Sequence, residues 1–268
     1  MAIRTAIINV MAKTCYKASR SLLRDFGEVE QLQASRKGPK DFVFTANSAS
    51  QKKIVEELTY ARPDYGFLIK GTKMIESKDP KNRRWIIDPL NGSINFLHGI
   101  PHWSISIGLE EEGDLVAGAI YDATRDELFW AEKGLGAYLN DSRIRISERR
   151  DLSECLIATG SQPEEGDTTK FNSYLDGITK SSGTTRNLGS ASLNLAYLAA
   201  GRFDGFWQLQ IPAPEIAAGI IIVREAGGYI TDLGGGIQML SKKEILAANA
   251  RTHHRLLRLI KTIKDEEN

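Results

Sequence analysis

Hydrophobic residues recur at helical spacing in two stretches of the first sixty residues. The first stretch opens the chain, with apolar residues at positions 3, 6, 7, 10, 11, 22 and 23, and this period predicts an amphipathic helix. A second helix is predicted for residues 48–61, "SASQKKIVEELTYA", with Ser48 as its N-cap and Arg62-Pro63 as its end. A short apolar run from Trp85 to Ile87 then has the character of a strand.

Residues 103–147 have a different pattern. Apolar and polar residues alternate there, β-branched residues are frequent, and Gly and Asp recur at short, regular intervals. Alternation with frequent turn residues is typical of antiparallel strands joined by short connections. We therefore predict an antiparallel meander in this region.

After residue 150 short apolar runs alternate with helical periods. The predicted strands lie within residues 155–160, 204–209, 229–233 and 244–250, and the predicted helices cover residues 168–180, 190–202, 214–228 and 251–264. This order predicts an α/β, or α+β, fold with two docked halves, residues 1–150 and 151–268.

The composition is that of an ordinary globular protein and argues against several other classes of protein. Of 268 residues, 41% are hydrophobic, and the formal charge of +1 gives no overall field that favours nucleic acid or an anionic membrane. Cys15 and Cys155 are too far apart in sequence to indicate a disulfide framework or a zinc site. No apolar run reaches 18 residues, and the first residues lack the apolar core of a signal peptide. We expect a soluble, cytoplasmic protein.

The segment "DPLNGS", residues 88–93, allows two interpretations. Asn-Gly between apolar runs is a strong hairpin signal, because both residues tolerate positive φ. Alternatively, Asp88 ends a buried strand and Gly92-Ser93 opens a helix. Free amides and the positive helix end would then attract an anion, while the carboxylate holds a divalent cation.

Other polar residues are weaker candidates. Glu215 falls in a first helical turn, where an acid complements the helix dipole, although it becomes a metal ligand if that turn faces Asp88. His98 and His102 have i, i+4 spacing, but Gly99 and Pro101 between them disrupt a helix. The glycines at 234–236 lack the following Lys-Ser/Thr of a phosphate-binding loop and indicate a turn.

Several long segments together resemble the inositol monophosphatase family, in particular bacterial members of the SuhB (extragenic suppressor) type. They are "WIIDPLNGSINFLHGIPHWSISIGLE", "GSASLNLAYLAAGRFDGFW" and "EIAAGIIIVREAGG", and they occur in the family's order over nearly the whole chain. The resemblance implies a layered α-β-α-β-α sandwich, a homodimer, and Mg²⁺-dependent hydrolysis of small phosphate monoesters such as inositol monophosphates.

Part of the family's site matches this sequence directly. The resemblance implies that Asp88 is the bridging metal ligand and that Leu90 supplies a carbonyl ligand. Gly92 and Ser93 match the amides that hold phosphate, and the Ser93 hydroxyl matches the group that orients water. The second aspartate of the motif is Asn91 here, which the resemblance makes a weakened metal ligand.

The remaining family positions depart from the pattern. Lys70 replaces a metal-binding, water-activating glutamate, Asn47 replaces an aspartate, and Gln208 replaces the glutamate that contacts inositol. Glu215 replaces the aspartate ligand that begins a late helix and keeps its charge. Ala191 matches a phosphate- or substrate-binding position. Because charge is removed or reversed at most of these positions, we expect Mg²⁺ binding to be weak or absent.

Two readings of the function follow. In the first, the chain is a weakly active or non-catalytic family member that is retained for binding a phosphate anion, a small phosphate ester or, by family resemblance, a complex of ribosomal RNA transcription and processing. In the second, it is an active Mg²⁺-dependent phosphomonoesterase that tolerates the altered ligands.

Overall fold

The computed structural model describes residues 4–28, 39–161 and 168–266. In this part of the chain the α-helices are α1 (Ala6–Gly27), α3 (Pro39–Ala61), α4 (Ser93–Leu97), α5 (Thr168–Ser181), α6 (Ala191–Ala199), α7 (Ala213–Glu225), α8 (Met239–Lys242) and α9 (Ala250–Glu266), and one 3₁₀ turn covers Leu152–Glu154. Within these residues no helix is both long and apolar enough to cross a membrane.

The first sheet has seven strands in sequence order. They are β1 (Gly66–Ile69), β2 (Arg84–Asn91), β3 (Ser104–Glu111), β4 (Asp114–Asp122), β5 (Glu127–Glu132), β6 (Gly136–Leu139) and β7 (Ser142–Ile144). β1 is parallel to β2, and all later pairs are antiparallel. The meander predicted for residues 103–147 is therefore confirmed.

The second sheet has five strands in the order β11-β12-β10-β8-β9. Its strands are β8 (Leu156–Thr159), β9 (Thr184–Asn187), β10 (Gly205–Gln208), β11 (Tyr229–Thr231) and β12 (Ile245–Ala248). β8 lies parallel to both β9 and β10, whereas β12 is antiparallel to β10 and β11. All four strands predicted after residue 150 are present; β9 was not predicted.

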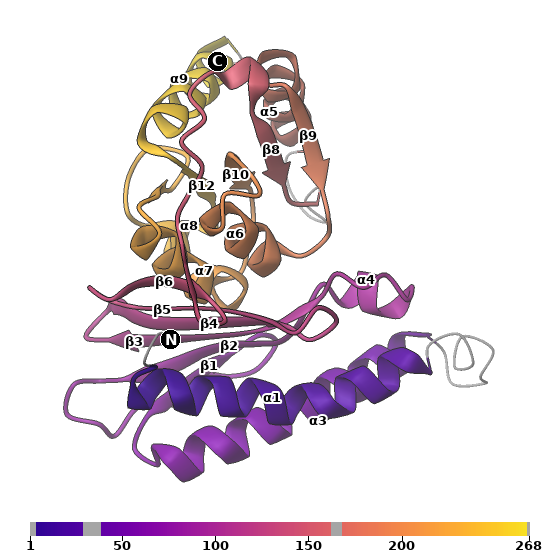
Figure 1. The fold of residues 1–268 in the computed structure, drawn as a ribbon. Helices are drawn as coiled ribbons and strands as arrows, with labels where there is room; N and C mark the ends of the chain where they lie inside the picture. Colours follow the sequence, from indigo (N-terminus) through magenta and orange to yellow (C-terminus); the bar gives the residue numbers. More distant parts are fainter. Residues whose placement is uncertain (1–3, 29–38, 162–167, 267–268) are drawn as a thin grey trace.

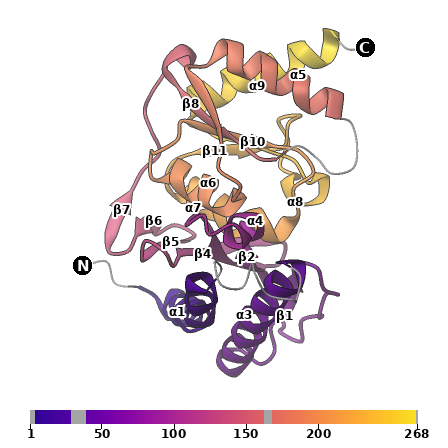
Figure 2. The ribbon, with the colours of Figure 1, turned by 90° about the vertical axis from the view of Figure 1, so that its right-hand side faces the viewer.

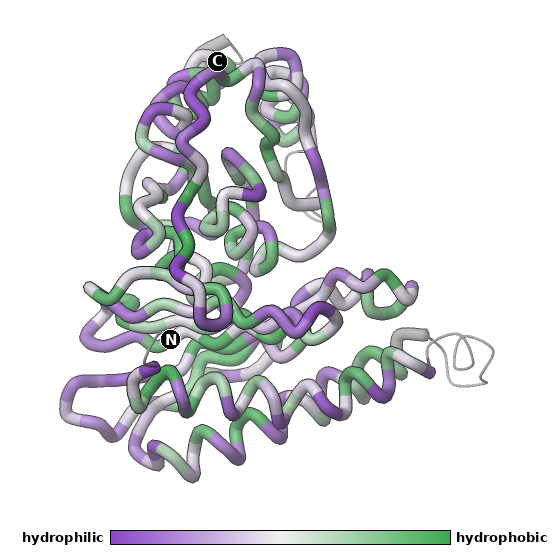
Figure 3. Tube along the Cα trace, in the orientation of Figure 1, coloured by the Kyte–Doolittle hydropathy of each residue, from purple (hydrophilic) through white to green (hydrophobic). Residues whose placement is uncertain are grey.

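The elements stack in five layers (Figures 1 and 2). α1 and α3 cover the outer face of the first sheet, α6 and α7 lie between the two sheets, and α5 and α9 cover the second sheet. This is the predicted α-β-α-β-α sandwich. Hydrophobic and hydrophilic residues alternate along α1 and α3 in Figure 3, as expected for helices with one face on a sheet and the other in solvent.

The start of α3 corrects one prediction. The helix begins at Pro39 rather than near Ser48, so Ser48 is an exposed residue inside the helix and not its N-cap. Proline at the first helical position and Asp41 in the first turn are both favourable start signals. The predicted end before Arg62-Pro63 is correct. The earlier start places Asn47 in the middle of a helix.

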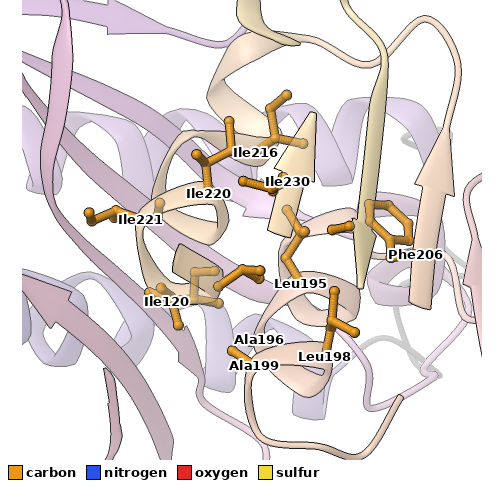
Figure 4. Packing of buried hydrophobic residues seen from close by; sticks show 14 of the residues in the cluster. Ile120, Leu195, Ala196, Leu198, Ala199, Phe206, Ile216, Ile220, Ile221 and Ile230 are labelled. Atoms are coloured by element: carbon orange, nitrogen blue, oxygen red, sulfur yellow. The ribbon is translucent and has the colours of Figure 1, made fainter. Parts of the chain in front are cut away.

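The central layer is the most apolar part of the molecule. Figure 4 shows side chains of α6 and α7 converging with those of β4, β10 and β11. Ile216 and Ile220 of α7, Leu195 of α6 and Phe206 of β10 are fully buried there. Each such side chain contributes about 1.5–3 kcal/mol relative to exposure. This packing fixes the start of α7 against the first sheet.

Two paired glycines let α7 lie directly on that sheet. Gly108 of β3 and Gly118 of β4 are register partners. A Cβ at Gly118 would lie 2.6 Å from Ile221 Cγ2 and 2.7 Å from the carbonyl oxygen of Ala218. Contacts this short with helix backbone require the helix to move.

We therefore expect Gly118→Ala to lower the free energy of unfolding by about 2 kcal/mol, through overpacking between α7 and β4. Urea unfolding followed by circular dichroism measures this loss. Gly27→Ala is the control, because a Cβ at Gly27 meets no atom within 4 Å. Equal stability of the two variants would show that α7 adjusts without strain.

Candidate active site

Four polar side chains from three elements meet at the end of β2. Asp88 and Asn91 belong to β2, Lys70 directly follows β1, and Glu215 lies in the first turn of α7. Because β1 and β2 are parallel, the residue after β1 reaches the same edge of the sheet as Asp88. The packing of α7 on the sheet brings Glu215 to the same point. The structure thus joins residues that are up to 145 positions apart in sequence.

Ion pairs and hydrogen bonds connect the four side chains directly. The Lys70 ammonium lies 2.9 Å from Glu215 Oε1 and 3.3 Å from Asp88 Oδ2. The Asn91 side-chain nitrogen donates to Asp88 Oδ2 at 2.9 Å and to Glu215 Oε2 at 3.1 Å. One ammonium and one amide nitrogen therefore lie between the two carboxylates.

Two serines fix the orientation of Asn91. Its side-chain oxygen accepts hydrogen bonds from Ser190 Oγ at 2.6 Å and from the backbone N–H of Ser192 at 3.1 Å. A backbone N–H can only donate, so the oxygen must face α6 and the nitrogen must face the carboxylates. The role of Asn91 as a weakened metal ligand stays a prediction; its nitrogen, not its oxygen, faces Asp88 and Glu215.

Burial and charge act in opposite directions on this cluster. Burial raises the pKa of the Glu215 carboxyl, and the Lys70 ammonium opposes that rise. Burial by itself lowers the pKa of Lys70, but the Asp88 and Glu215 carboxylates outweigh it, so the pKa of Lys70 lies above its ordinary value. Lys70 is therefore an ammonium ion at neutral pH and a poor general base.

The backbone of residues 88–93 passes from a strand into a helix and does not form a hairpin. β2 continues to Asn91, Gly92 has φ +85°, and Ser93 begins α4. Asp88 Oδ1 accepts the backbone N–H of Leu90 at 3.1 Å. A Cβ at Gly92 would lie 2.8 Å from the carbonyl oxygen of His102, and φ there is in the left-handed region.

A pocket of about 620 Å³ opens beside residues 88–93. Its described lining includes five of the predicted site residues: Asn47, Lys70, Asp88, Leu90 and Ser93. The other predicted residues are absent from that lining; Asn91 and Glu215 belong to the polar cluster, and Gly92 precedes Ser93. Ala191 is buried at the start of α6. Gln208 is the last residue of β10, and its side chain packs against Gly160. Sequence analysis brought these last two to the site only through family resemblance.

The residues at the cluster do not fit a bound Mg²⁺. This ion needs several oxygen ligands in near-octahedral geometry, whereas here an ammonium and an amide nitrogen face Asp88 and Glu215. Across residues 4–28, 39–161 and 168–266, no group of three or more His, Cys, Asp or Glu side chains is placed to hold a metal.

Sequence analysis missed two parts of the site. It did not assign Ser190 and Ser192 to Asn91, although Ser190 caps α6 as a serine before an apolar helix often does. It also missed the apolar wall of the pocket, which Val43 and Phe44 of α3 share with α4. The wall was not predicted because the helix was expected to begin at residue 48, so residues 42–44 were not assigned to it.

The two histidines of the i, i+4 pair lie in different environments. His98 is exposed at the end of α4, whereas His102 is buried and packs edge-on against Tyr197 of α6, with ring centroids 5.5 Å apart. Burial lowers the pKa of His102 to about 4, against the opposing effect of the Asp122 carboxylate. His102 is thus a neutral packing residue between the first sheet and α6.

This buried histidine predicts a loss of stability in acid. The unfolded chain binds the proton near pH 6.5 but the folded chain only near pH 4, so stability falls as the pH drops between these values. We expect His102→Gln to remove about 2 kcal/mol of the loss between neutral pH and about pH 5. Thermal unfolding at a series of pH values measures the slope. His98→Gln, at an exposed position, is the matched control.

Comparison with known proteins gives one consistent family. The chain matches the sequence model of the inositol monophosphatase family over residues 4–265. It is 45% identical over 260 residues to a protein of Mesorhizobium japonicum named inositol-1-monophosphatase. The alignment covers 96% of this chain and 97% of that protein. It is 33% identical over 262 residues to Nus factor SuhB of Pasteurella multocida, covering 97% and 98%. The crystal structure of extragenic suppressor protein SuhB from Bartonella henselae superposes with a TM-score of 0.88 at 45% identity, covering 96% of this chain and 99% of that one.

Proposed function

The chain belongs to the inositol monophosphatase family, and from that premise we propose that it is a member with weak or absent Mg²⁺-dependent phosphatase activity, retained for binding. One observation carries the proposal: the Lys70 ammonium and the Asn91 amide nitrogen both contact Asp88 and Glu215. The carboxylates that would attract a cation already have partners.

The size of the electrostatic effect supports this proposal. Two unit charges 4 Å apart interact by roughly 4 kcal/mol at an effective dielectric constant of about 20, and a divalent ion doubles that figure. A cation entering beside Lys70 meets repulsion of this order. Since about 1.4 kcal/mol changes affinity tenfold, the site would bind Mg²⁺ weaker by several powers of ten than an all-carboxylate site.

The roles of the other residues are part of the same proposal. Gly92 and Ser93 would contact a phosphate or small phosphate ester, with Ala191 and Gln208 at the family's substrate-binding positions. Lys70 and Asn47 stand where the family has acids that activate water. A lysine held in the ammonium form accepts no proton from water, so we expect attack on phosphorus to be slow.

An active Mg²⁺-dependent phosphomonoesterase is the second candidate. The observation that favours it is the 45% identity to a protein named inositol-1-monophosphatase over almost the full length of both chains. On this reading Asp88, the Leu90 carbonyl and Glu215 would hold the metal after Lys70 moves away.

Hydrolysis of inositol 1-phosphate over a Mg²⁺ titration separates the two candidates. The Mesorhizobium japonicum relative serves as the positive control under identical conditions. We expect at least a hundredfold lower turnover for this chain at every Mg²⁺ concentration. Turnover within tenfold of the relative would establish the second candidate and overturn the first.

The binding role includes a protein partner as a further proposal. A relative 33% identical over nearly the whole chain is named Nus factor SuhB, which supports a partner in a transcription complex. The homodimer implied by family resemblance and the cytoplasmic location expected from the sequence stay predictions. Sedimentation of the purified chain tests the dimer, and binding of purified bacterial transcription factors to the immobilised chain tests the partner.

A further inference from the structure

The pocket beside Lys70 has a wall of apolar side chains. Val43 and Phe44 come from α3, and Ile94 and Leu97 come from α4, which lies over the N-terminal part of α3 in Figure 1. Phe44 and Ile94 remain 69% and 68% exposed. Two large apolar side chains this exposed at one pocket offer surface that a ligand can cover, at roughly 25 cal/mol per Å² of apolar area.

The inner end of the pocket, where Lys70 and Asp88 line it, adjoins a cluster with a small net negative charge; Glu215 belongs to that cluster but not to the described lining. With both acids ionised, the two carboxylates of Asp88 and Glu215 and the one ammonium of Lys70 leave one negative charge. Lys70 has three N–H donors, of which Asp88 and Glu215 take two. Its side chain is 36% exposed and lines the pocket, so the third donor can meet an acceptor on a ligand. A dianion is disfavoured here relative to a singly charged head group.

A polyol would find no hydrogen-bond partner in the apolar side chains of the wall, although the same lining also includes the polar residues Asn47, Ser48, Gln51, Thr72 and Ser93. Each hydroxyl that leaves water without a new hydrogen bond costs about 1–3 kcal/mol. Gln208, at the position of the family's inositol contact, packs against Gly160 and is not among the described residues that line the pocket. The wall itself therefore favours contact with a hydrocarbon group.

We propose that this pocket binds a ligand with an aromatic or branched-alkyl body and a head group of no more than one negative charge, in preference to a dianionic polyol phosphate. This inference rests on the proposed function, since a resident metal ion would reverse the charge at the inner end. The body covers Phe44 and Ile94, and the head group accepts a hydrogen bond from Lys70.

Isothermal titration calorimetry with three probes tests the inference. Phenyl sulfate has an aromatic body and one charge, phenyl phosphate has the same body and up to two charges, and inositol 1-phosphate has a polyol body. Without added metal, we expect phenyl sulfate to bind most tightly, phenyl phosphate next and inositol 1-phosphate most weakly. The dissociation constants of the first and the last should differ by about tenfold. Binding of inositol 1-phosphate at least as tight as phenyl sulfate would overturn the inference, as would no measurable binding of phenyl sulfate.

A pair of variants locates the binding. Phe44→Ser removes an exposed ring from the wall, and we expect it to weaken phenyl sulfate binding about fivefold to tenfold. Tyr60→Ser is the control, because Tyr60 is 92% exposed on the same helix and does not line the pocket. Equal weakening by both changes would remove the pocket as the binding site. The phosphatase assay tests the proposed function separately. A wrong ligand preference can therefore be distinguished from a wrong proposed function.

Discussion

Replacing Lys70 by methionine is expected to lower the free energy of unfolding by about 2 kcal/mol, less than the roughly 3–5 kcal/mol for one partner of a fully buried ion pair, because the Lys70 side chain is 36% exposed. The ammonium is the positive charge that contacts both Asp88 and Glu215. Asp88 is fully buried, so without Lys70 two carboxylates share the amide of Asn91 and repel each other. Chemical unfolding at neutral pH measures the loss.

The pH dependence identifies the cause of that loss. The pKa of Glu215 is already raised by burial, and removal of the ammonium should raise it further. A protonated Glu215 no longer repels Asp88, so the deficit of Lys70→Met should shrink as the pH is lowered. Lys133→Met is the control, since Lys133 and Asp114 form an exposed pair, and such pairs contribute about 0–1 kcal/mol. A deficit independent of pH would assign the effect to packing alone.

Much of the fold could be predicted because the chain's local signals agree with its tertiary structure. The meander has turn residues at each connection, and α7 is one apolar helix that ends before two glycines. β1 and β9 were missed for a physical reason. β1 is a four-residue strand at the edge of the first sheet, and β9, "TTRN", is a polar strand at the edge of the second. Short or polar strands take their stability from their neighbours, which no local pattern records.

The site shows where prediction from sequence ends. Family resemblance was enough to place Asp88, Lys70, Asn91 and Glu215 at one site, and the structure brings these four together. It could not predict which way Asn91 faces. That orientation depends on Ser190, which is 99 positions away in sequence and lies beside Asn91 only because α6 packs on the first sheet.

The double change Lys70→Glu, Asn91→Asp is expected to create a metal-dependent protein. It replaces the ammonium and the amide nitrogen by two carboxylates beside Asp88 and Glu215. Without a cation, four acids then repel one another, and the melting temperature in EDTA should fall well below that of the unchanged chain. Mg²⁺ should restore it, because a ligand at 100 times its dissociation constant stabilises a protein by about 2.7 kcal/mol.

Thermal unfolding in EDTA and over a Mg²⁺ series, at constant ionic strength, measures this effect. The unchanged chain should show no shift with Mg²⁺, because Lys70 already neutralises part of the cluster. The single change Asn91→Asp is the informative control. It adds one acid but leaves the ammonium in contact with Asp88 and Glu215, so its response to Mg²⁺ should be small. If Mg²⁺ stabilised the unchanged chain as much as the double variant, Lys70 would not exclude the ion and the proposed loss of metal binding would be wrong.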